Sequence, residues 1–144
     1  MTTQSYVAAF RAYEWSADIA ELAERFFGAC PGARHVVLLN EANGPIDIGP
    51  YEKVAHTEDF SEFGFPEYPP GQSLYLNSDY AFVLLYRRLP GFAHYVICES
   101  DVAVNLSLDP MMREAQAGGL DAILHRIQPC QPDWYFHELS LIHI

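Results

Sequence analysis

The chain has 144 residues, half of them hydrophobic, which is enough material for one buried core and too little for two full domains. Nineteen acidic residues outnumber 8 lysines and arginines, and the formal net charge of -11 argues against a nucleic-acid partner. The cysteines show no paired spacing, and the start matches neither a signal peptide nor a membrane span. We therefore expect a single cytoplasmic domain over residues 1–144, without a membrane span.

The first part of the chain predicts a strand, a helix and a strand. Residues 6–10 form a short, nearly continuous apolar run, typical of a strand buried on both faces of a parallel sheet. Ser16 is suited to cap the helix that follows, and Gly28 begins the stretch that stops it. The valines and leucines of residues 35–39 are too few for a helix between these breaks and predict a second buried strand.

The next part predicts a strand, a helix and a strand. Residues 53–56 form a third, shorter strand, before a long stretch rich in Phe, Glu and Pro. Asn77 is suited to cap a helix that has Asp79 in its first turn and continues through the apolar residues 81–89. The apolar run at residues 93–98 predicts a fourth strand, which ends abruptly in polar residues.

This order of elements predicts an α/β fold with an open, mainly parallel sheet and helices on both faces, where ligands bind beyond the carboxyl ends of the strands. Glu99 and Asp101 follow the fourth strand. Residues two apart in an extended segment point to the same side, so we expect both carboxylates to leave a central strand together and face one cation. Two hard oxygen ligands, completed by water and a diphosphate, suit Mg2+ or Mn2+.

Two runs of residues in this order carry a resemblance to a known family. Asn77-Ser78-Asp79-Tyr80 opens a helix, and Glu99-Ser100-Asp101-Val102 ends an apolar strand. Over roughly residues 5–108 the chain resembles the donor-binding half of a GT-A-fold glycosyltransferase, a fold of the nucleotide-diphospho-sugar transferase superfamily. In that family an Asp-x-Asp motif, or a variant of it, holds the divalent metal that bridges the diphosphate. Glu99 and Asp101 match this motif as Glu-x-Asp.

The resemblance implies transfer of a sugar from a UDP- or GDP-linked donor to an unknown acceptor, with Glu99 and Asp101 as metal ligands. The exits of the first two strands would then border the nucleotide. This arrangement nominates Arg11 and Tyr13 for phosphate and base contacts, and Asn40 or Glu41 for the ribose. Asp79 is a weaker candidate, because it also suits a purely structural place in the first turn of its helix.

The end of the chain departs from the family pattern. The residues after Leu108 are too few for the half that binds the acceptor. Residues 110–127 predict a pair of helices broken at Gly118 and Gly119, and residues 134–144 predict a last strand with an apolar end. We therefore expect a shortened, Rossmann-like form of the GT-A fold. It is either a truncated form or a subunit whose partner, such as a second copy in a homodimer, covers this edge.

Three classes of function remain open from the sequence. The first is the metal-dependent glycosyltransferase or its donor-binding part, the second a non-catalytic binding or assembly module that keeps the fold, and the third another metal-dependent α/β phosphate-ester enzyme. Each candidate residue also has a structural interpretation. Glu99 and Asp101 could be solvated carboxylates of an acidic protein, and Cys98 is interpreted as a core residue. The histidines, His56 among them, lack metal spacing and are interpreted as structural or surface groups.

Overall fold

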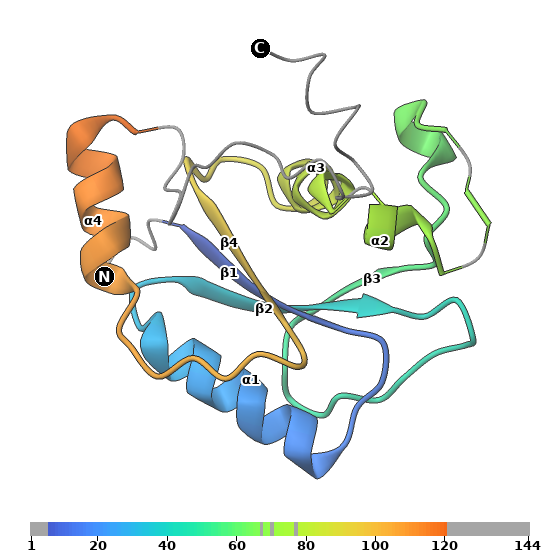
Figure 1. Ribbon diagram of the computed structural model, residues 1–144, viewed down its shortest axis with the longest axis horizontal. Helices are drawn as coiled ribbons and strands as arrows, with labels where there is room; N and C mark the ends of the chain where they lie inside the picture. The colour runs from blue at the N-terminus through green and yellow to red at the C-terminus, as the bar shows by residue number, and fades with distance from the viewer. Residues whose placement is uncertain (1–5, 67, 70, 77, 121–144) are drawn as a thin grey trace, which may run out of the picture.

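The computed structural model describes residues 6–66, 68–69, 71–76 and 78–120. Its centre is a sheet of four strands, all parallel, in the order β3-β2-β1-β4 (Figure 1). The strands are β1 (Val7–Ala12), β2 (Arg34–Asn40), β3 (Lys53–His56) and β4 (Tyr95–Glu99). The predicted α/β fold with a parallel sheet is confirmed, and each predicted strand is present within a residue or two of its expected bounds.

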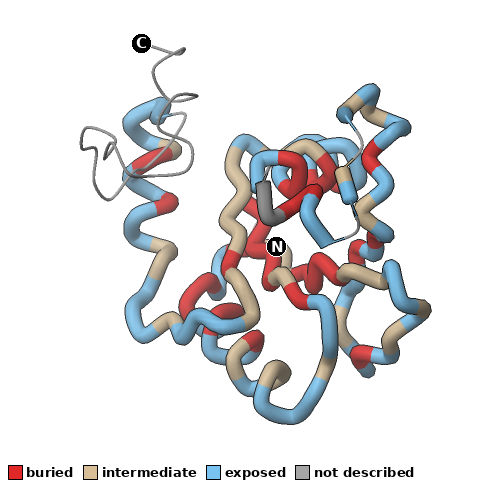
Figure 2. The backbone as a smooth tube through the Cα atoms, turned by 45° about the vertical axis from the view of Figure 1, so that its right-hand side comes forward, coloured by how far each residue is buried: buried red, intermediate tan, exposed pale blue. Residues whose placement is uncertain are grey.

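Helices pack on both faces of this sheet, as the order of elements predicts. The helical elements are α1 (Ala17–Ala29), the short 3-10 helix η1 (Ser61–Phe63), α2 (Ser73–Leu76), α3 (Asp79–Arg88) and α4 (Asp109–Gly118). Side chains of α1 and α4 join one apolar core, and those of α2 and α3 join a second core. Figure 1 shows α1 and α3 on opposite sides of the strands, and Figure 2 shows exposed residues on both the outer loops and the helices.

The two central strands supply side chains to both cores because both of their faces are covered. Along β1, Ala8 and Phe10 belong to the core beside α1, whereas Val7 and Ala9 belong to the core beside α3. All four are fully buried. A strand that is covered on both faces needs apolar residues at successive positions, which explains the unbroken run in the sequence.

The boundaries of α1 and α3 follow local chemistry. Ser16 caps α1 as expected, since its side-chain oxygen accepts a hydrogen bond from the Ile19 N–H at 3.3 Å. Helix α3 begins at Asp79 with Ser78 at the N-cap position. Asn77, which the sequence nominates as the cap, lies outside the described residues. Arg87 and Arg88 occupy the last turn of α3, where positive charge complements the helix dipole.

Helix α4 closes the described part of the chain. It ends at Gly118, and Gly119 follows in the left-handed conformation with φ 61°, so the predicted break at these glycines is confirmed. The second predicted helix and the last strand fall in residues 121–144, outside the described residues. Among the helices that the structure describes, none has the length and apolar character needed to cross a membrane.

Candidate functional site at the carboxyl edge of the sheet

Each of the four strands carries a polar side chain at its last position or, in β1, at the position before it, and these positions lie toward the same edge of the sheet. These four side chains, which we name the carboxyl-edge row, are Arg11 in β1, Asn40 in β2, His56 in β3 and Glu99 in β4. The register pairs Arg11 directly with Glu99, and Asn40 directly with His56. Arg11 is level with Leu38 of β2, so Asn40 and His56 lie two residues further along their strands than Arg11 and Glu99. Since neighbouring strands lie about 4.8 Å apart, the row extends over three spacings, or roughly 14 Å, across the sheet.

The carboxyl-edge row lies on one face of the sheet, the face covered by α3. The residue two positions before each member of the row belongs to the core beside α3 or packs against it. These four residues are Ala9, Leu38, Val54 and Ile97. Because side chains two apart in a strand point the same way, the four polar groups continue the α3 face beyond its apolar part. An apolar core thus gives way to a polar edge within a single strand position on each strand.

Arg11 and Glu99 form an ion pair in the row. Arg11 Nη1 lies 2.9 Å from Glu99 Oε1, and the two side chains are 22% and 45% exposed. Glu99 was predicted as a metal ligand, and here one of its oxygens contacts a guanidinium. A pair this exposed contributes about 1 kcal/mol or less, so either partner is able to exchange it for a ligand.

Asp101 does not continue the strand from which Glu99 projects. The chain turns directly after β4, where the Glu99 carbonyl accepts a hydrogen bond from the Val102 N–H at 3.1 Å. Asp101 lies in this turn and is exposed. The expectation of an extended segment from Glu99 to Asp101 is therefore wrong. So is the expectation of a central strand, because β4 forms one margin of the sheet in the part of the chain that the structure describes.

The donor set at this margin fits a divalent cation only in company with a ligand. Within the described residues, no three or more His, Cys, Asp or Glu side chains come together as a metal site. Glu99 and Asp101 offer hard carboxylate oxygens, which suit Mg2+ or Mn2+. These cations are commonly held by one or two carboxylates, with substrate phosphates and waters completing the coordination. The residues present fit that mode of binding and do not form an all-protein cage.

Asn40 holds the loops that follow β2 and β3. Its Nδ2 donates to Glu58 Oε1 at 2.6 Å, and its Oδ1 accepts a hydrogen bond from the Ala42 N–H at 2.9 Å. Both ends of the amide are therefore used in the unliganded chain. Its predicted contact with a ribose stays a prediction.

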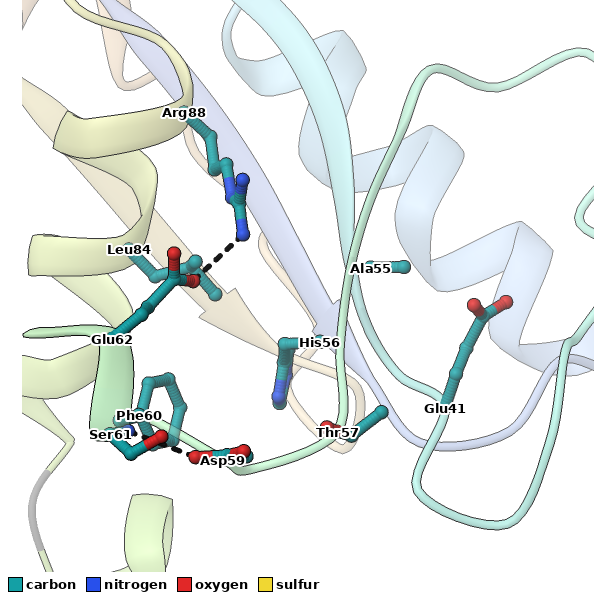
Figure 3. Close-up of a pocket in the computed structure, with 10 residues that line it drawn as sticks. All are labelled: Glu41, Ala55, His56, Thr57, Asp59, Phe60, Ser61, Glu62, Leu84 and Arg88. Atoms are coloured by element: carbon teal, nitrogen blue, oxygen red, sulfur yellow. Dashed lines mark hydrogen bonds and ion pairs between the residues drawn. The ribbon is translucent and has the colours of Figure 1, made fainter.

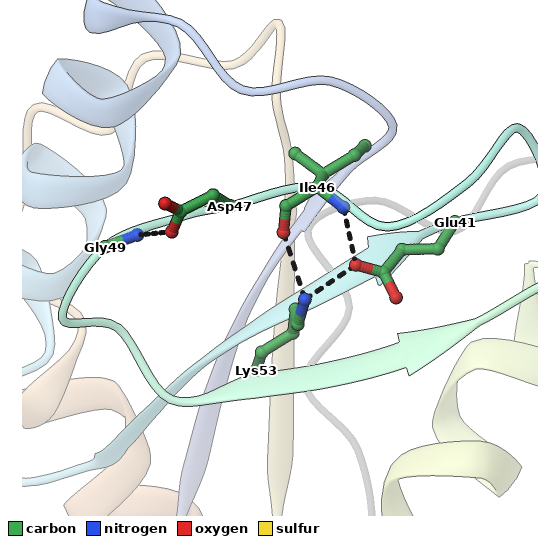
Figure 4. Close-up of polar contacts among 5 residues, drawn as sticks. All are labelled: Glu41, Ile46, Asp47, Gly49 and Lys53. Atoms are coloured by element: carbon green, nitrogen blue, oxygen red, sulfur yellow. Dashed lines mark hydrogen bonds and ion pairs between the residues drawn. The ribbon is translucent and has the colours of Figure 1, made fainter.

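Glu41 fixes the loop between β2 and β3 (Figure 4). Its Oε1 accepts hydrogen bonds from the Ile46 N–H at 2.9 Å and from Lys53 Nζ at 2.6 Å, and Lys53 Nζ also donates to the Ile46 carbonyl at 3.0 Å. These bonds, first from the Ile46 backbone and then from Lys53, hold the pKa of Glu41 below its usual value. The contacts give Glu41 a structural role, and its predicted ribose contact stays a prediction.

Tyr13 and Asp79 are both accessible to a ligand. Tyr13 follows β1 directly and is 68% exposed, so its ring is presented to solvent at the carboxyl edge. Asp79 is the first residue of α3 and is exposed.

Cys98, the residue before Glu99, is buried, and burial raises the pKa of its thiol to about 11, with the Glu99 charge adding to the shift. The prediction that Cys98 is a core residue is confirmed, because its side chain is buried in the core beside α1.

A cavity of about 300 Å³ lies beside the His56 end of the row, between β3, η1 and α3 (Figure 3). His56 and Phe60 line it, with Leu84 and Arg88 from α3. Arg88 is paired with Glu62 of η1 at 2.8 Å. The sequence did not nominate His56 because the histidines were judged by metal spacing alone. A signal is present, however, because His56 is the last residue of an alternating strand and lies at a strand exit, as Arg11 does.

Glu58 is the second residue of the site that the sequence missed. Among the described residues it is the only one other than glycine with a positive φ, 65°. Its carboxylate accepts from Asn40 and, at 3.0 Å, from the Gly71 N–H, and its carbonyl accepts from the Ser73 hydroxyl at 3.3 Å. Strained backbone persists where surrounding contacts enforce it, and such residues concentrate at functional sites.

No known relative supplies a function for this site. Comparison with protein-family models, with curated proteins and with solved structures gives no match.

Proposed function

We propose that this chain is the donor-binding part of a glycosyltransferase-like protein, which binds a UDP- or GDP-linked sugar at the carboxyl edge of its sheet. The observation that carries the proposal is the Arg11–Glu99 pair. It lies between β1 and β4, where the strand order reverses: β2 and β3 extend to one side of β1, and β4 lies on the other. In open α/β sheets such a reversal is the point at which ligands bind.

Charge supports a diphosphate at this position. The chain carries a net charge of -11, so an anionic ligand needs a local cation. Arg11 supplies one, and a guanidinium binds phosphate oxygens in a two-pronged geometry that suits it better than a single carboxylate oxygen. When Arg11 turns to a diphosphate, the Glu99 carboxylate is released, and together with Asp101 in the turn that follows β4 it is available for Mg2+ or Mn2+.

The other residues predicted for the site would contact the remaining parts of the donor. Tyr13 offers an exposed aromatic face at the exit of β1, and Asn40 and Glu41 border the exit of β2 on the ribose side. Asp79 is an exposed carboxylate at the start of α3. A bound divalent metal would act as a Lewis acid on the leaving diphosphate. The residues of this chain would bind and orient the donor, and the acceptor remains to be identified.

Binding measurements test the proposal directly. Isothermal titration of the purified chain with UDP-sugars and GDP-sugars, each with and without Mn2+, is expected to give binding that depends on the metal. Asp101→Asn should weaken it at least tenfold, because a metal ligand is lost and Asp101 is too exposed to matter for folding. Glu114→Gln is the matched control. It removes one negative charge from an exposed position of α4, away from the carboxyl edge, and should leave binding unchanged.

Two outcomes separate the possible functions. Absence of binding to every donor, in a sample shown to be folded by circular dichroism, would contradict the proposal. Metal-dependent binding that Asp101→Asn abolishes, with no release of free sugar over time, would favour a non-catalytic module that retains the donor site.

A further inference from the structure

His56 carries a buried hydrogen-bond donor that has no partner in the described structure. The residue is only 8% exposed. Its Nδ1 accepts a hydrogen bond from the Glu58 N–H at 3.2 Å, so in the neutral ring the proton must be on Nε2. Nε2 is buried, and no acceptor reaches it from the part of the chain that the structure describes. His56 therefore has an Nε2–H donor without an acceptor among the described residues.

An unsatisfied buried donor destabilises a protein, and such groups are rare in native structures. A leucine or phenylalanine would suit the apolar neighbours of His56, since Val54 precedes it on the same face and the ring of Phe60 lies 5.8 Å from its own. A polar ring at this position is explained if a bound molecule supplies the missing acceptor. His56 lines a cavity of about 300 Å³, and a molecule bound there supplies the acceptor once the ring shifts enough to bring the buried Nε2 to the cavity surface.

The charges around His56 differ from those at the other end of the row. Glu41, Asp59 and Glu62 line the same cavity, and its one arginine, Arg88, is paired with Glu62. A phosphate would be repelled here, whereas an uncharged acceptor such as a carbonyl oxygen would not. Burial, with the positive charge of Arg11 adding to it, lowers the pKa of His56 to about 4, so the ring is a neutral donor at physiological pH.

We propose that His56 selects the base of the bound nucleotide: its Nε2–H donates to a ring carbonyl oxygen, and the neighbouring Asp59 carboxylate accepts the adjacent ring N–H. The proposal rests on the proposed function, because it assumes a nucleotide whose diphosphate lies near Arg11. The row spans roughly 14 Å from β4 to β3, which leaves room for the base at the β3 end. Uracil and guanine present a carbonyl beside a ring N–H, whereas adenine has no carbonyl, so UDP and GDP should be preferred over ADP.

Two substitutions of His56 separate its two ring nitrogens. Asn at this position can accept the Glu58 N–H as Nδ1 does, in a common turn geometry, but it does not reach the place of Nε2. Gln is longer by one carbon and restores a donor near that place. We expect His56→Asn to weaken UDP binding roughly tenfold, while His56→Gln keeps most of the affinity. The substitution His94→Asn, at the opposite end of the sheet, is the control and should leave UDP binding unchanged.

Titrations of the full chain with UDP, GDP, ADP and inorganic pyrophosphate, all with Mn2+, test the proposal. In the wild type UDP and GDP should bind more tightly than ADP, and in His56→Asn this preference should disappear while the pyrophosphate affinity stays the same. Equal affinity of the wild type for UDP, GDP and ADP would overturn the proposal, as would unchanged UDP binding in His56→Asn. Pyrophosphate binding without any base preference would leave the proposed function intact and remove only the role of His56. If neither the nucleotides nor pyrophosphate bound, the proposed function and the role of His56 would both be overturned.

Discussion

The two ends of the sheet handle their polar groups differently. At the amino end, Tyr6 is 1% exposed and its hydroxyl donates to Asp109 Oδ1, and the same carboxylate accepts the Gly32 N–H. Desolvation and this bond to Asp109 raise the pKa of Tyr6. At the carboxyl end, Glu58 has a strained backbone and His56 keeps an unpaired donor. At the amino end, polar groups pair with one another and hold α4 against the sheet. At the carboxyl end, some polar groups stay free to bind a ligand.

Unpaired polar atoms do not by themselves distinguish the two ends. His94, just before β4, also has a buried nitrogen without a partner, its Nδ1. Its other nitrogen, however, lies 2.8 Å from the Leu120 carbonyl and fastens the chain after α4. What distinguishes the carboxyl end is the combination of an unpaired group with a strained residue, an adjoining cavity and an exchangeable ion pair. Consistent local choices serve stability, and the places where they fail together indicate function.

The largest expected effect is a loss of stability in the apolar core beside α1, away from the carboxyl-edge row. Phe26 in α1 is fully buried and packs among Phe10 and Phe27 in the core beside α1. Phe26→Ala should lower the free energy of unfolding by about 3 to 5 kcal/mol, because it removes a large apolar side chain and leaves a cavity. Urea denaturation followed by circular dichroism measures this change. Phe82→Ala, which shortens a 44% exposed side chain of α3, is the control and should lower it by less than about 1 kcal/mol.

The sequence was sufficient to predict the frame of the molecule. The strands β1 and β2 are buried on both faces, so their apolar runs had a single good explanation, and Ser16 marked the start of α1 by its own chemistry. The common edge of parallel strands also brought out Arg11, Asn40 and Glu99 as site candidates. The predictions of the strands and of the Ser16 cap succeeded because local pattern and tertiary environment agree there. The functional roles of Arg11, Asn40 and Glu99 stay predictions.

The sequence could not predict which side chains contact one another at the site. The Arg11–Glu99 pair depends on β4 lying beside β1, a strand order that no local pattern specifies. The turn after β4 came from a backbone hydrogen bond between Val102 and Glu99, and nothing in the residue types demanded it. The positive φ of Glu58 is enforced by contacts with Asn40 and with Gly71, which is 13 residues away in the chain. Long-range contacts of this kind are visible only once the fold is known.

A second prediction concerns pH and the carboxyl end alone. His56 has a pKa of about 4 in the folded chain and about 6.5 in the unfolded chain. Between these values the unfolded state binds more protons, so acidification favours unfolding: stability is unaffected by His56 above about pH 6.5 and is lost progressively as the pH falls towards 4. The loss amounts to roughly 3 kcal/mol.

The measurement compares urea unfolding of the wild type and of His56→Gln at several pH values between about 7 and 4. For each protein the free energy of unfolding is plotted against pH. Glu41 and Asp59, whose pKa values are held below their usual range, are present in both proteins, so a difference between the two slopes is due to His56. The variant should lose less stability on acidification. Equal slopes would mean that His56 is not held neutral by burial, and the contrast between the two ends would lose one of its supports.

The smallest expected effect tests the backbone strain at Glu58. Both Glu58→Gly and Glu58→Ala remove the carboxylate and with it the bonds from Asn40 and Gly71, but only glycine adopts a φ of 65° without a clash of its Cβ atom. The glycine variant should therefore be more stable than the alanine variant by about 1 kcal/mol, the reverse of their usual order. Urea denaturation of the two variants side by side gives this difference. If alanine proved equal to or better than glycine, Glu58 would be held by its side-chain bonds alone. The carboxyl edge would then differ from the amino end in its unpaired donor and its cavity, without a strained backbone that ligand binding could relieve.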